Sequence, residues 1–324
     1  MIGTVPLPEG CVRACHACKH RQWSAEQSLE QKQRFLAETL AVWADRLHTV
    51  RSAPEDRRLH YRDKIKLSAR CYDGRWEFGM EPRDEFIPIP RCPVQTERVR
   101  HTLEALGRHL PRFEELPLRY VVQNGALATL VVKAPALASE DWVTTELQAE
   151  LADAGVAGLH VNLHPAAGRI LFAEKGWRCL WGQSRVQDAR GLWHGPAAFG
   201  QLLPELHDES LLEAENFFQL TSDTPVVDLY CGVGASLRRW SALSRSVVGV
   251  EFDGEAVECA RRNAPETAVL RGPCAQRLPQ VRAWLLEQGN ALHAAYVNPP
   301  RTGLEEAVVQ WLANEGRPNR IGYL

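Results

Sequence analysis

Three cysteines near the start of the chain, Cys11, Cys15 and Cys18, stand within eight positions. Thiols so closely spaced are usually metal ligands or disulfide partners. The opening MIGTVPLPEG lacks the basic and apolar regions of a secretory signal, and no apolar run reaches the roughly 18 residues of a membrane span. We therefore expect a cytoplasmic protein without membrane contact, in which thiols stay reduced. Nine cysteines, an odd number, also fit a disulfide framework poorly, so metal or cluster ligation is favoured.

A second group of residues suited to chemistry surrounds a glycine-containing loop. The segment VVDLYCGVGASL has the pattern of a buried strand that runs into Gly232 and Gly234 and then into a helix. Such a loop lets a ligand approach the backbone at the carboxyl edge of a sheet. Glu251 ends the next expected strand, where its carboxylate can accept hydrogen bonds from ribose hydroxyls. NAD and S-adenosylmethionine both use this layout, but Leu237 replaces the third glycine of a dinucleotide loop, which favours S-adenosylmethionine.

The segment AAYVNPPRTGL supplies a polar residue at the end of another strand. Its strand ends in Asn298, and two prolines follow. The prolines hold the backbone rigid and prevent a helix from starting at once. A side-chain amide fixed there faces the site across the sheet from the cofactor. Nucleotide methyltransferases use this arrangement at their fourth strand, so the pattern favours methyl transfer.

The elements expected to position these residues change character at about residue 197. Before it, a long amphipathic helix is predicted over residues 24–50 with Ser24 as its N-cap, followed by a β-hairpin that turns at YDG. The proline-rich segment FIPIPRCPV is expected to be a rigid loop. Further strands are predicted in RYVVQNG, ATLVVKA, LHVNLHP and RILFAEKG.

After residue 197 the pattern is that of a doubly wound parallel sheet. Helix-like segments alternate with five short apolar strands, VVDLY, SVVGVE, TAVLR, AAYVN and RIGYL. At 324 residues the chain is long enough for two or three domains, and we place their boundaries at 1–95, 96–195 and 196–324. A formal net charge of −2 excludes a globally basic nucleic-acid binder, although not a local basic face.

Three of these motifs, DLYCGVG, GVEFDGEAVECARRNA and NPPRTGL, together resemble the RNA uracil-C5 methyltransferases. More narrowly, they resemble the 23S ribosomal RNA branch, which carries an N-terminal [4Fe–4S] cluster. The resemblance spans nearly the whole chain. It implies a class I, Rossmann-like S-adenosylmethionine methyltransferase domain, preceded by a β-rich α+β part that contacts RNA and carries a cysteine cluster. The implied reaction is methylation of C5 of a uridine in RNA, with 23S ribosomal RNA the expected partner and a monomer the expected state.

The resemblance also assigns roles to individual residues. The fourth cluster ligand lies in a C-P segment some eighty residues after the first three, which is RCPV here. The ligands it implies are Cys11, Cys15, Cys18 and Cys92, of which Cys11 matches least because its gap to Cys15 is shorter than usual. The cofactor residues are Gln201, Tyr230, Gly232, Gly234, Glu251 and Asn298, and the RNA contacts lie in HYRDKIKL at Tyr61, Arg62 and Lys64.

Two further departures from the family pattern concern the adenine contacts and the reaction itself. Pro273 and Cys274 occupy the stretch where many relatives place an acidic or amide side chain near the adenine. The family's nucleophilic cysteine and its general base, a glutamate, are expected beyond Leu324. Cys231 lies in the cofactor loop and does not replace the nucleophile convincingly, and the position after the two prolines is Arg301 rather than cysteine. We therefore expect this sequence to contain the residues that bind the cofactor, but not the residues that form the covalent intermediate with uracil.

Alternative interpretations remain for both sets of residues. Four cysteines at mixed spacing suit Zn²⁺ as well as an iron–sulfur cluster. The spacing of the first three is also similar to that of radical S-adenosylmethionine enzymes, although a long helix follows them here. For the whole chain, the alternative is a truncated or inactive relative that binds RNA and cofactor without turnover.

Overall fold

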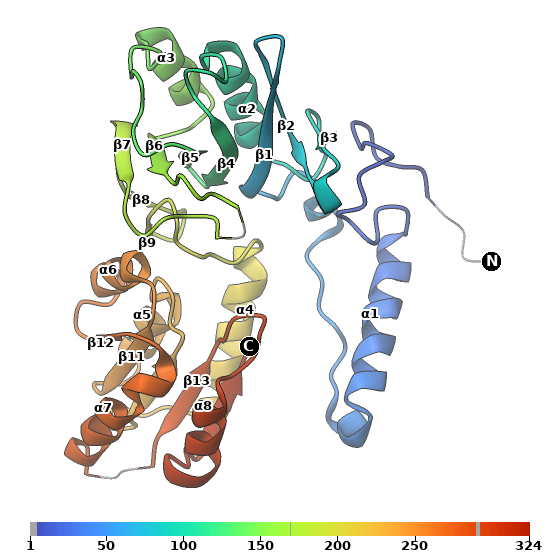
Figure 1. Cartoon of the computed structure of the whole chain (residues 1–324). Helices are drawn as coiled ribbons and strands as arrows, with labels where there is room; N and C mark the ends of the chain where they lie inside the picture. The colour runs from blue at the N-terminus through green and yellow to red at the C-terminus, as the bar shows by residue number, and fades with distance from the viewer. Residues whose placement is uncertain (1–4, 169, 290–291) are drawn as a thin grey trace. The chain divides into compact units, whose positions relative to one another are not determined.

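The computed structural model describes residues 5–168, 170–289 and 292–324. The chain forms two compact units, Met1–Ser184 and Arg185–Leu324 (Figure 1). Each unit has its own sheet, with seven strands in the first and five in the second, and a two-stranded ribbon accompanies the second. Among the described residues, no helix combines the length and apolar character needed to cross a membrane.

The N-terminal helix of the first unit, α1, covers Ala25–Thr39. Ser24 caps it as predicted, because Ser24 Oγ accepts from Gln27 N at 3.1 Å and the Gln27 side chain accepts from Ser24 N at 2.9 Å. The prediction of one helix over residues 24–50 is wrong. A 3-10 turn, Ala41–Arg46, follows α1, and the returning chain is held where Gln33 Oε1 accepts from Val50 N at 2.7 Å.

The sheet of the first unit has the strand order β3-β2-β1-β4-β5-β6-β7. The predicted hairpin is confirmed: β1 and β2 are antiparallel and turn at Asp73 and Gly74, which both have positive φ. The prediction that the proline-rich segment is a loop throughout is wrong in part, because Ile87–Pro88 pairs with β2 as a short edge strand, a position that tolerates proline. The strands are β1 (Lys64–Tyr72), β2 (Arg75–Met80), β3 (Ile87–Pro88), β4 (Leu118–Asn124), β5 (Leu127–Val132), β6 (Gly158–Leu163) and β7 (Trp177–Gly182).

The strand expected in RILFAEKG is not formed by the described residues 170–176, and this prediction is wrong. Asn162 on β6 explains the difference. Its side-chain amide donates to Ala173 O at 3.0 Å and accepts from Ala173 N at 2.9 Å. A side chain thus satisfies the backbone groups that a neighbouring strand would have paired, and the chain joins the sheet only at Trp177.

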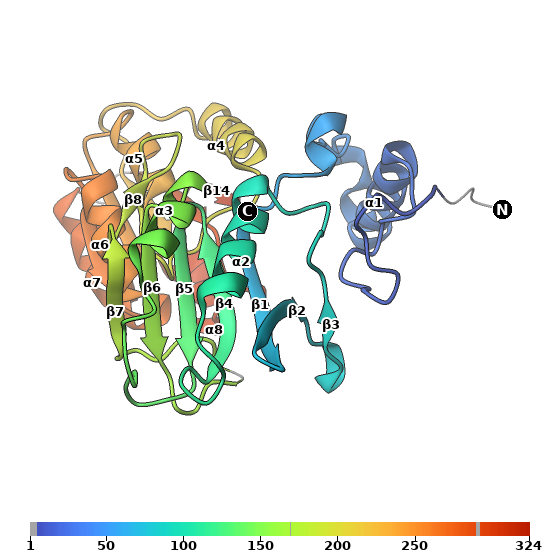
Figure 2. The same ribbon diagram turned by 90° about the horizontal axis from the view of Figure 1, so that it is seen from above.

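Two helices cover one face of this sheet, α2 (Glu97–His109) and α3 (Thr145–Asp153) (Figure 2). Their buried residues, such as Leu106 and Leu151, share one core with the alternate β1 residues Ile65 and Leu67. The intervening β1 residues, including Lys66, therefore belong to the opposite face. Part of that face is covered by Leu171 and Phe172.

The second unit is a parallel sheet with the order β12-β11-β10-β13-β14, and it confirms all five predicted strands. Helices α4, α5 and α6 pack on one face, and α7 and α8 on the other. The strands are β10 (Val226–Leu229), β11 (Val247–Glu251), β12 (Ala268–Arg271), β13 (Ala294–Val297) and β14 (Arg320–Tyr323). The helices are α4 (Pro204–Phe218), α5 (Ala235–Ser241), α6 (Gly254–Asn263), α7 (Cys274–Glu287) and α8 (Glu306–Gln310). A π-helical turn, Trp311–Glu315, continues α8. The two-stranded ribbon consists of β8 (Val186–Gln187) and β9 (Trp193–His194).

Candidate functional site

The glycine loop lies between β10 and α5, at the carboxyl edge of the parallel sheet. Gly232 and Gly234 both have positive φ, at 56° and 83°. A Cβ on Gly234 would lie 2.9 Å from Ala260 Cα, so this glycine lets the loop pack directly on α6. A Cβ on Gly232 would meet no atom within 4 Å. The loop is therefore fixed on one side and open on the other, which leaves its backbone accessible to a ligand.

Glu251 is connected directly to this loop. Its carboxylate accepts from Gly232 N at 2.9 Å and from Asp253 N at 2.8 Å. Burial raises the pKa of Glu251, and these backbone N–H groups oppose the shift. The ends of β10 and β11 thus meet at one half-buried carboxylate, which is the geometry expected of a ribose acceptor.

Two other predicted cofactor residues lie at the same edge. Asn298 directly follows β13, and its backbone N donates to Leu229 O at 3.2 Å. Tyr230 directly follows β10 in a left-handed conformation, with φ of 61°. Its hydroxyl donates to Glu305 Oε2 at 3.1 Å, which fixes the ring despite the unfavourable backbone. Gln201 lies in the irregular segment before α4, and within the described structure no hydrogen bond joins it to the other five predicted cofactor residues.

A buried carboxylate beneath this edge of the sheet was not predicted from the sequence. Asp228 on β10 is 0% exposed, and neither of its oxygens has a hydrogen-bond partner among the described residues. Burial raises the pKa of Asp228 to about 7, although Ser236 and Trp240 act in the opposite direction. The signal was present in the sequence as an acidic residue inside the apolar run VVDLY.

A buried amide at the end of α6 was missed as well. Asn263 donates from Nδ2 to Val233 O at 2.8 Å, inside the glycine loop. The same amide accepts from Trp193 N at 2.7 Å and donates to Trp193 O at 2.9 Å. Asn263 therefore ties the β8–β9 ribbon to the loop. A lone asparagine at a helix end gives no such indication in sequence.

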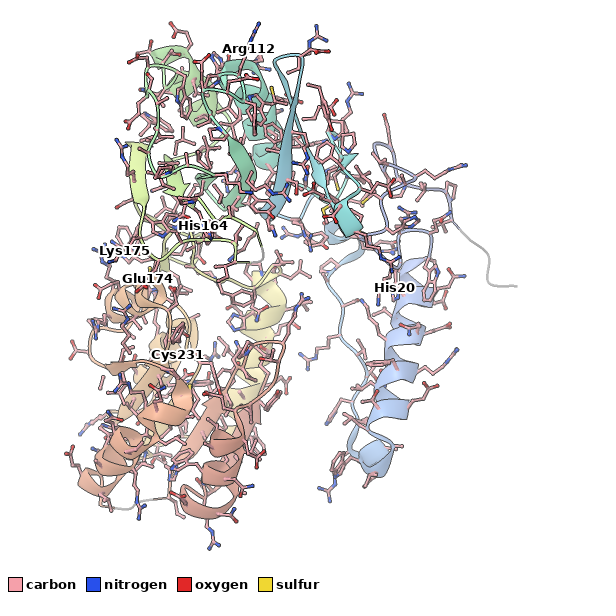
Figure 3. All side chains as sticks on the ribbon, viewed as in Figure 1. His20, Arg112, His164, Glu174, Lys175 and Cys231 are labelled. Carbon is pink, nitrogen blue, oxygen red and sulfur yellow. The ribbon has the colours of Figure 1, made fainter. Side chains whose placement is uncertain are left out.

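The four cysteines implied as cluster ligands line one pocket of about 440 Å³ in the first unit. Burial raises the pKa of Cys18 and of Cys92, and in both cases the negative charges of Cys11 and Cys15 add to the shift. A bound cation would relieve that repulsion. His20, labelled in Figure 3, lines the same pocket, and its Nδ1 lies 2.8 Å from Ser28 Oγ.

The four thiols share a pocket but do not have the geometry of a metal-binding site. Within the described ranges, no three His, Cys, Asp or Glu side chains converge closely enough to hold a metal ion. The donor chemistry fits an iron–sulfur cluster or zinc, since four thiols share one pocket. Ligation by all four would require them to converge further.

The residues predicted to contact RNA lie in two different parts of the first unit. Tyr61 and Arg62 line the cysteine pocket. Lys64 begins β1, and burial lowers its pKa to about 8. Asp63 between them accepts from Thr96 Oγ1 at 2.9 Å and pairs with Arg98 at 2.6 Å, so it is engaged within the unit.

A compact basic set on β1 and β4 was not singled out from the sequence. Lys66 Nζ lies 4.3 Å from the centroid of the Tyr120 ring, and Arg119 Cζ lies 4.7 Å from it. Glu81, whose side chain is 7% exposed, pairs with Arg119 at 2.6 Å and also with Arg70. Only the register of β1 against β4 shows that Lys66 and Tyr120 are near neighbours, because 53 residues separate them in sequence. We call Lys66, Arg119 and Tyr120 the basic face.

The second unit has the geometry of a class I methyltransferase. A parallel sheet carries a glycine loop after its first strand, an acid at the end of its second and an amide after its fourth. All three features meet at the carboxyl edge, where ligands bind in doubly wound folds.

Comparisons with known proteins agree with this class. A solved structure with the same fold is the tRNA (uracil-54, C5)-methyltransferase of Pyrococcus abyssi in complex with S-adenosyl-L-homocysteine. It matches with a TM-score of 0.67 and 19% identity, over 95% of this chain and 74% of that one. The fold of the chain is therefore that of a mixed α/β methyltransferase. No family model matches the chain.

Sequence relatives are RNA methyltransferases. An uncharacterized RNA methyltransferase of Lactobacillus johnsonii is 23% identical over 99% of this chain and 74% of its own length. One of Clostridium tetani is 26% identical over 82% of this chain and 61% of its own length. The chain thus spans about three fifths to three quarters of the length of these relatives. The chain is thus similar in sequence to RNA methyltransferases, and the solved structure shows its fold.

Proposed function

We propose that this protein transfers a methyl group from S-adenosylmethionine to C5 of a uridine in RNA, with 23S ribosomal RNA as the substrate. The observation that carries the proposal is the connection of Gly232 to Glu251 at the carboxyl edge, with Asn298 beside it. This edge offers an open loop backbone for the methionine part and a carboxylate for the ribose. The relatives named above and the motifs quoted from the sequence support RNA and uracil C5.

The chemistry requires more than a methyl donor. A thiolate adds to C6 of the uracil, and the enolate so formed attacks the methyl carbon through C5, which releases S-adenosylhomocysteine. A base then removes the C5 proton, and the thiolate leaves. Near the proposed cofactor, burial raises the pKa of Cys231 well above its usual range and that of Cys274 to about 12. Neither thiol suits the attack, so we assign the roles of nucleophile and general base to none of the residues described above.

Two measurements test this function. Calorimetry should show S-adenosylhomocysteine binding to the 324-residue chain and no comparable binding of NAD; tighter binding of NAD would reverse the assignment. The full-length protein should release tritium from ribosomal RNA that contains [5-³H]uridine, because only substitution at C5 expels that atom. Methyl transfer without tritium release would reject uracil C5.

We propose further that Cys11, Cys15, Cys18 and Cys92 hold a [4Fe–4S] cluster. Their common pocket supports this ligand set. Once bound, such a cluster would tie the N-terminal segment to the loop that carries Cys92. The proposal concerns architecture and assigns the cluster no step in methyl transfer.

The cluster is tested by iron content and visible absorption after anaerobic purification. Cys92→Ser should lose most of the iron and the brown colour. Cys179→Ser is the matched control, because this thiol lies on β7 and outside the pocket, so it should retain both. Colourless wild-type protein with stoichiometric zinc would replace the cluster with a zinc site.

A further inference from the structure

Glu305 stands just before α8, at the N-cap position, yet its side chain makes no capping bond there. Its Oε2 instead accepts from the Tyr230 hydroxyl at 3.1 Å and from Ala275 N at 3.3 Å. Ala275 lies in the first turn of α7, so a carboxylate from the loop after β13 reaches the helix that follows β12. Glu305 thereby joins three separate segments at the carboxyl edge of the sheet.

The second carboxylate of this edge lies close to the same place. Burial raises the pKa of Cys274, and the charges of Glu305 and Glu251 both add to the shift. The two carboxylates therefore flank the turn between β12 and α7. A backbone hydrogen bond also places Glu251 beside this turn, because the Glu251 carbonyl accepts from Gly272 N at 2.9 Å. A nucleoside whose ribose is held by Glu251 has its base within reach of this turn.

The turn itself has no side chain that could accept a hydrogen bond from a base. It consists of Gly272, Pro273 and Cys274, and the Cys274 thiol is buried. Adenine presents an exocyclic amino group, which needs a hydrogen-bond acceptor. Glu305 Oε1 is such an acceptor, because among the described residues no hydrogen bond occupies it, while Oε2 is held by Tyr230 and Ala275.

We propose that Glu305 determines specificity for adenine, by accepting a hydrogen bond from the amino group of the bound S-adenosylmethionine. This inference rests on the function proposed above. It assigns to the loop after β13 the acceptor that the turn after β12 lacks. The bond between Glu305 and Tyr230 holds the carboxylate in place before the ligand arrives, which lowers the cost of ordering it on binding.

The test compares two ligands that differ only in the base. S-Adenosylhomocysteine carries the amino group, whereas S-inosylhomocysteine carries a carbonyl oxygen in its place, which a carboxylate repels. The wild-type chain should prefer the adenosyl ligand by on the order of tenfold or more, as expected for a hydrogen bond to a charged group. Glu305→Gln should reduce this ratio severalfold, because an amide can donate to the carbonyl oxygen. Glu306→Gln, the next residue and exposed, is the matched control and should keep the wild-type ratio.

Tyr230→Phe separates recognition from support. If Glu305 only positioned Tyr230, this variant would reduce the ratio as much as Glu305→Gln does. Under the proposal Tyr230→Phe keeps the carboxylate, which Ala275 N still holds, so it should retain most of the wild-type ratio. An unchanged ratio in Glu305→Gln overturns the proposal while leaving the proposed function intact. Failure of the wild-type chain to bind S-adenosylhomocysteine would instead reject the proposed function itself.

Discussion

The Gly232 backbone N–H donates to Glu251 Oε2 at 2.9 Å, which links the glycine loop to the end of the neighbouring strand. The bond holds the carboxylate at the edge of the sheet, and a second backbone donor, Asp253 N, orients its other oxygen. A ribose that binds here therefore meets an acceptor that is already oriented. Pre-organisation of this kind improves affinity because less freedom is lost on binding.

Removal of the Glu251 carboxylate should weaken the cofactor strongly. Glu251→Ala loses charge-assisted hydrogen bonds to ribose, which contribute about 1.5–3 kcal/mol, so the Kd for S-adenosylhomocysteine should rise roughly tenfold or more. Calorimetry measures this directly. Glu266→Ala, on the exposed turn after α6, should leave the Kd unchanged. Equal effects of the two variants would contradict the assigned role.

The two loop glycines should differ in their tolerance of alanine. Both have positive φ, so each substitution carries a backbone cost of about 1 kcal/mol. Gly234→Ala also places its Cβ 2.9 Å from Ala260 Cα, whereas Gly232→Ala enters open space. The total loss for Gly234→Ala should reach about 2–4 kcal/mol, as for other overpacked sites. Urea unfolding of both variants checks this, and an equal loss would show that the loop adapts.

Local sequence patterns predicted the parallel sheet well, because each strand is a short apolar run bounded by a helix. The same reasoning failed at residues 170–176, where the Asn162 side chain takes over the backbone hydrogen bonds of Ala173. It also could not find Glu305, because the meeting of a carboxylate with Tyr230, 75 residues away, depends on how loops from two strands close at one edge. The strands that carry the motifs were thus predictable, and the long-range contacts between the loops that follow them were not.

The buried carboxylate of Asp228 predicts an unusual pH dependence of stability. In an unfolded chain an aspartate titrates near pH 4, whereas burial raises the pKa of Asp228 to about 7 in the fold. Between these values the folded state retains a proton that the unfolded state has released, so the free energy of unfolding falls as the pH rises from about 4 to 7. The full effect is at most about 4 kcal/mol, at about 1.4 kcal/mol per pH unit.

Asp228→Asn tests this dependence, because asparagine keeps the shape and cannot ionise. Urea unfolding midpoints at pH 5 and pH 8 should differ less in the variant than in the wild-type protein. Asp223→Asn alters an exposed aspartate and should preserve the wild-type difference. An identical difference in Asp228→Asn would mean that this carboxylate does not titrate within the window.

The basic face of the first unit predicts how RNA binding responds to salt. Lys66 and Arg119 both lie over the buried ring of Tyr120, which places two cations side by side on this face of the sheet. If each neutralises one phosphate, Lys66→Ala combined with Arg119→Ala should lower the slope of log K against log[salt] by roughly 1.4–1.8. Loss of Arg119 leaves Glu81 paired with Arg70, so the fold should survive the change.

The measurement is fluorescence anisotropy with a labelled fragment of ribosomal RNA between about 50 and 200 mM salt. Arg75→Ala combined with Arg112→Ala is the control, because both side chains are exposed and neither stacks on Tyr120 (Arg112 is labelled in Figure 3). The control removes the same net charge, so a general electrostatic effect would weaken both double variants equally. That result would exclude a specific RNA contact at the basic face, whereas a smaller slope in the Lys66 and Arg119 variant alone would support it.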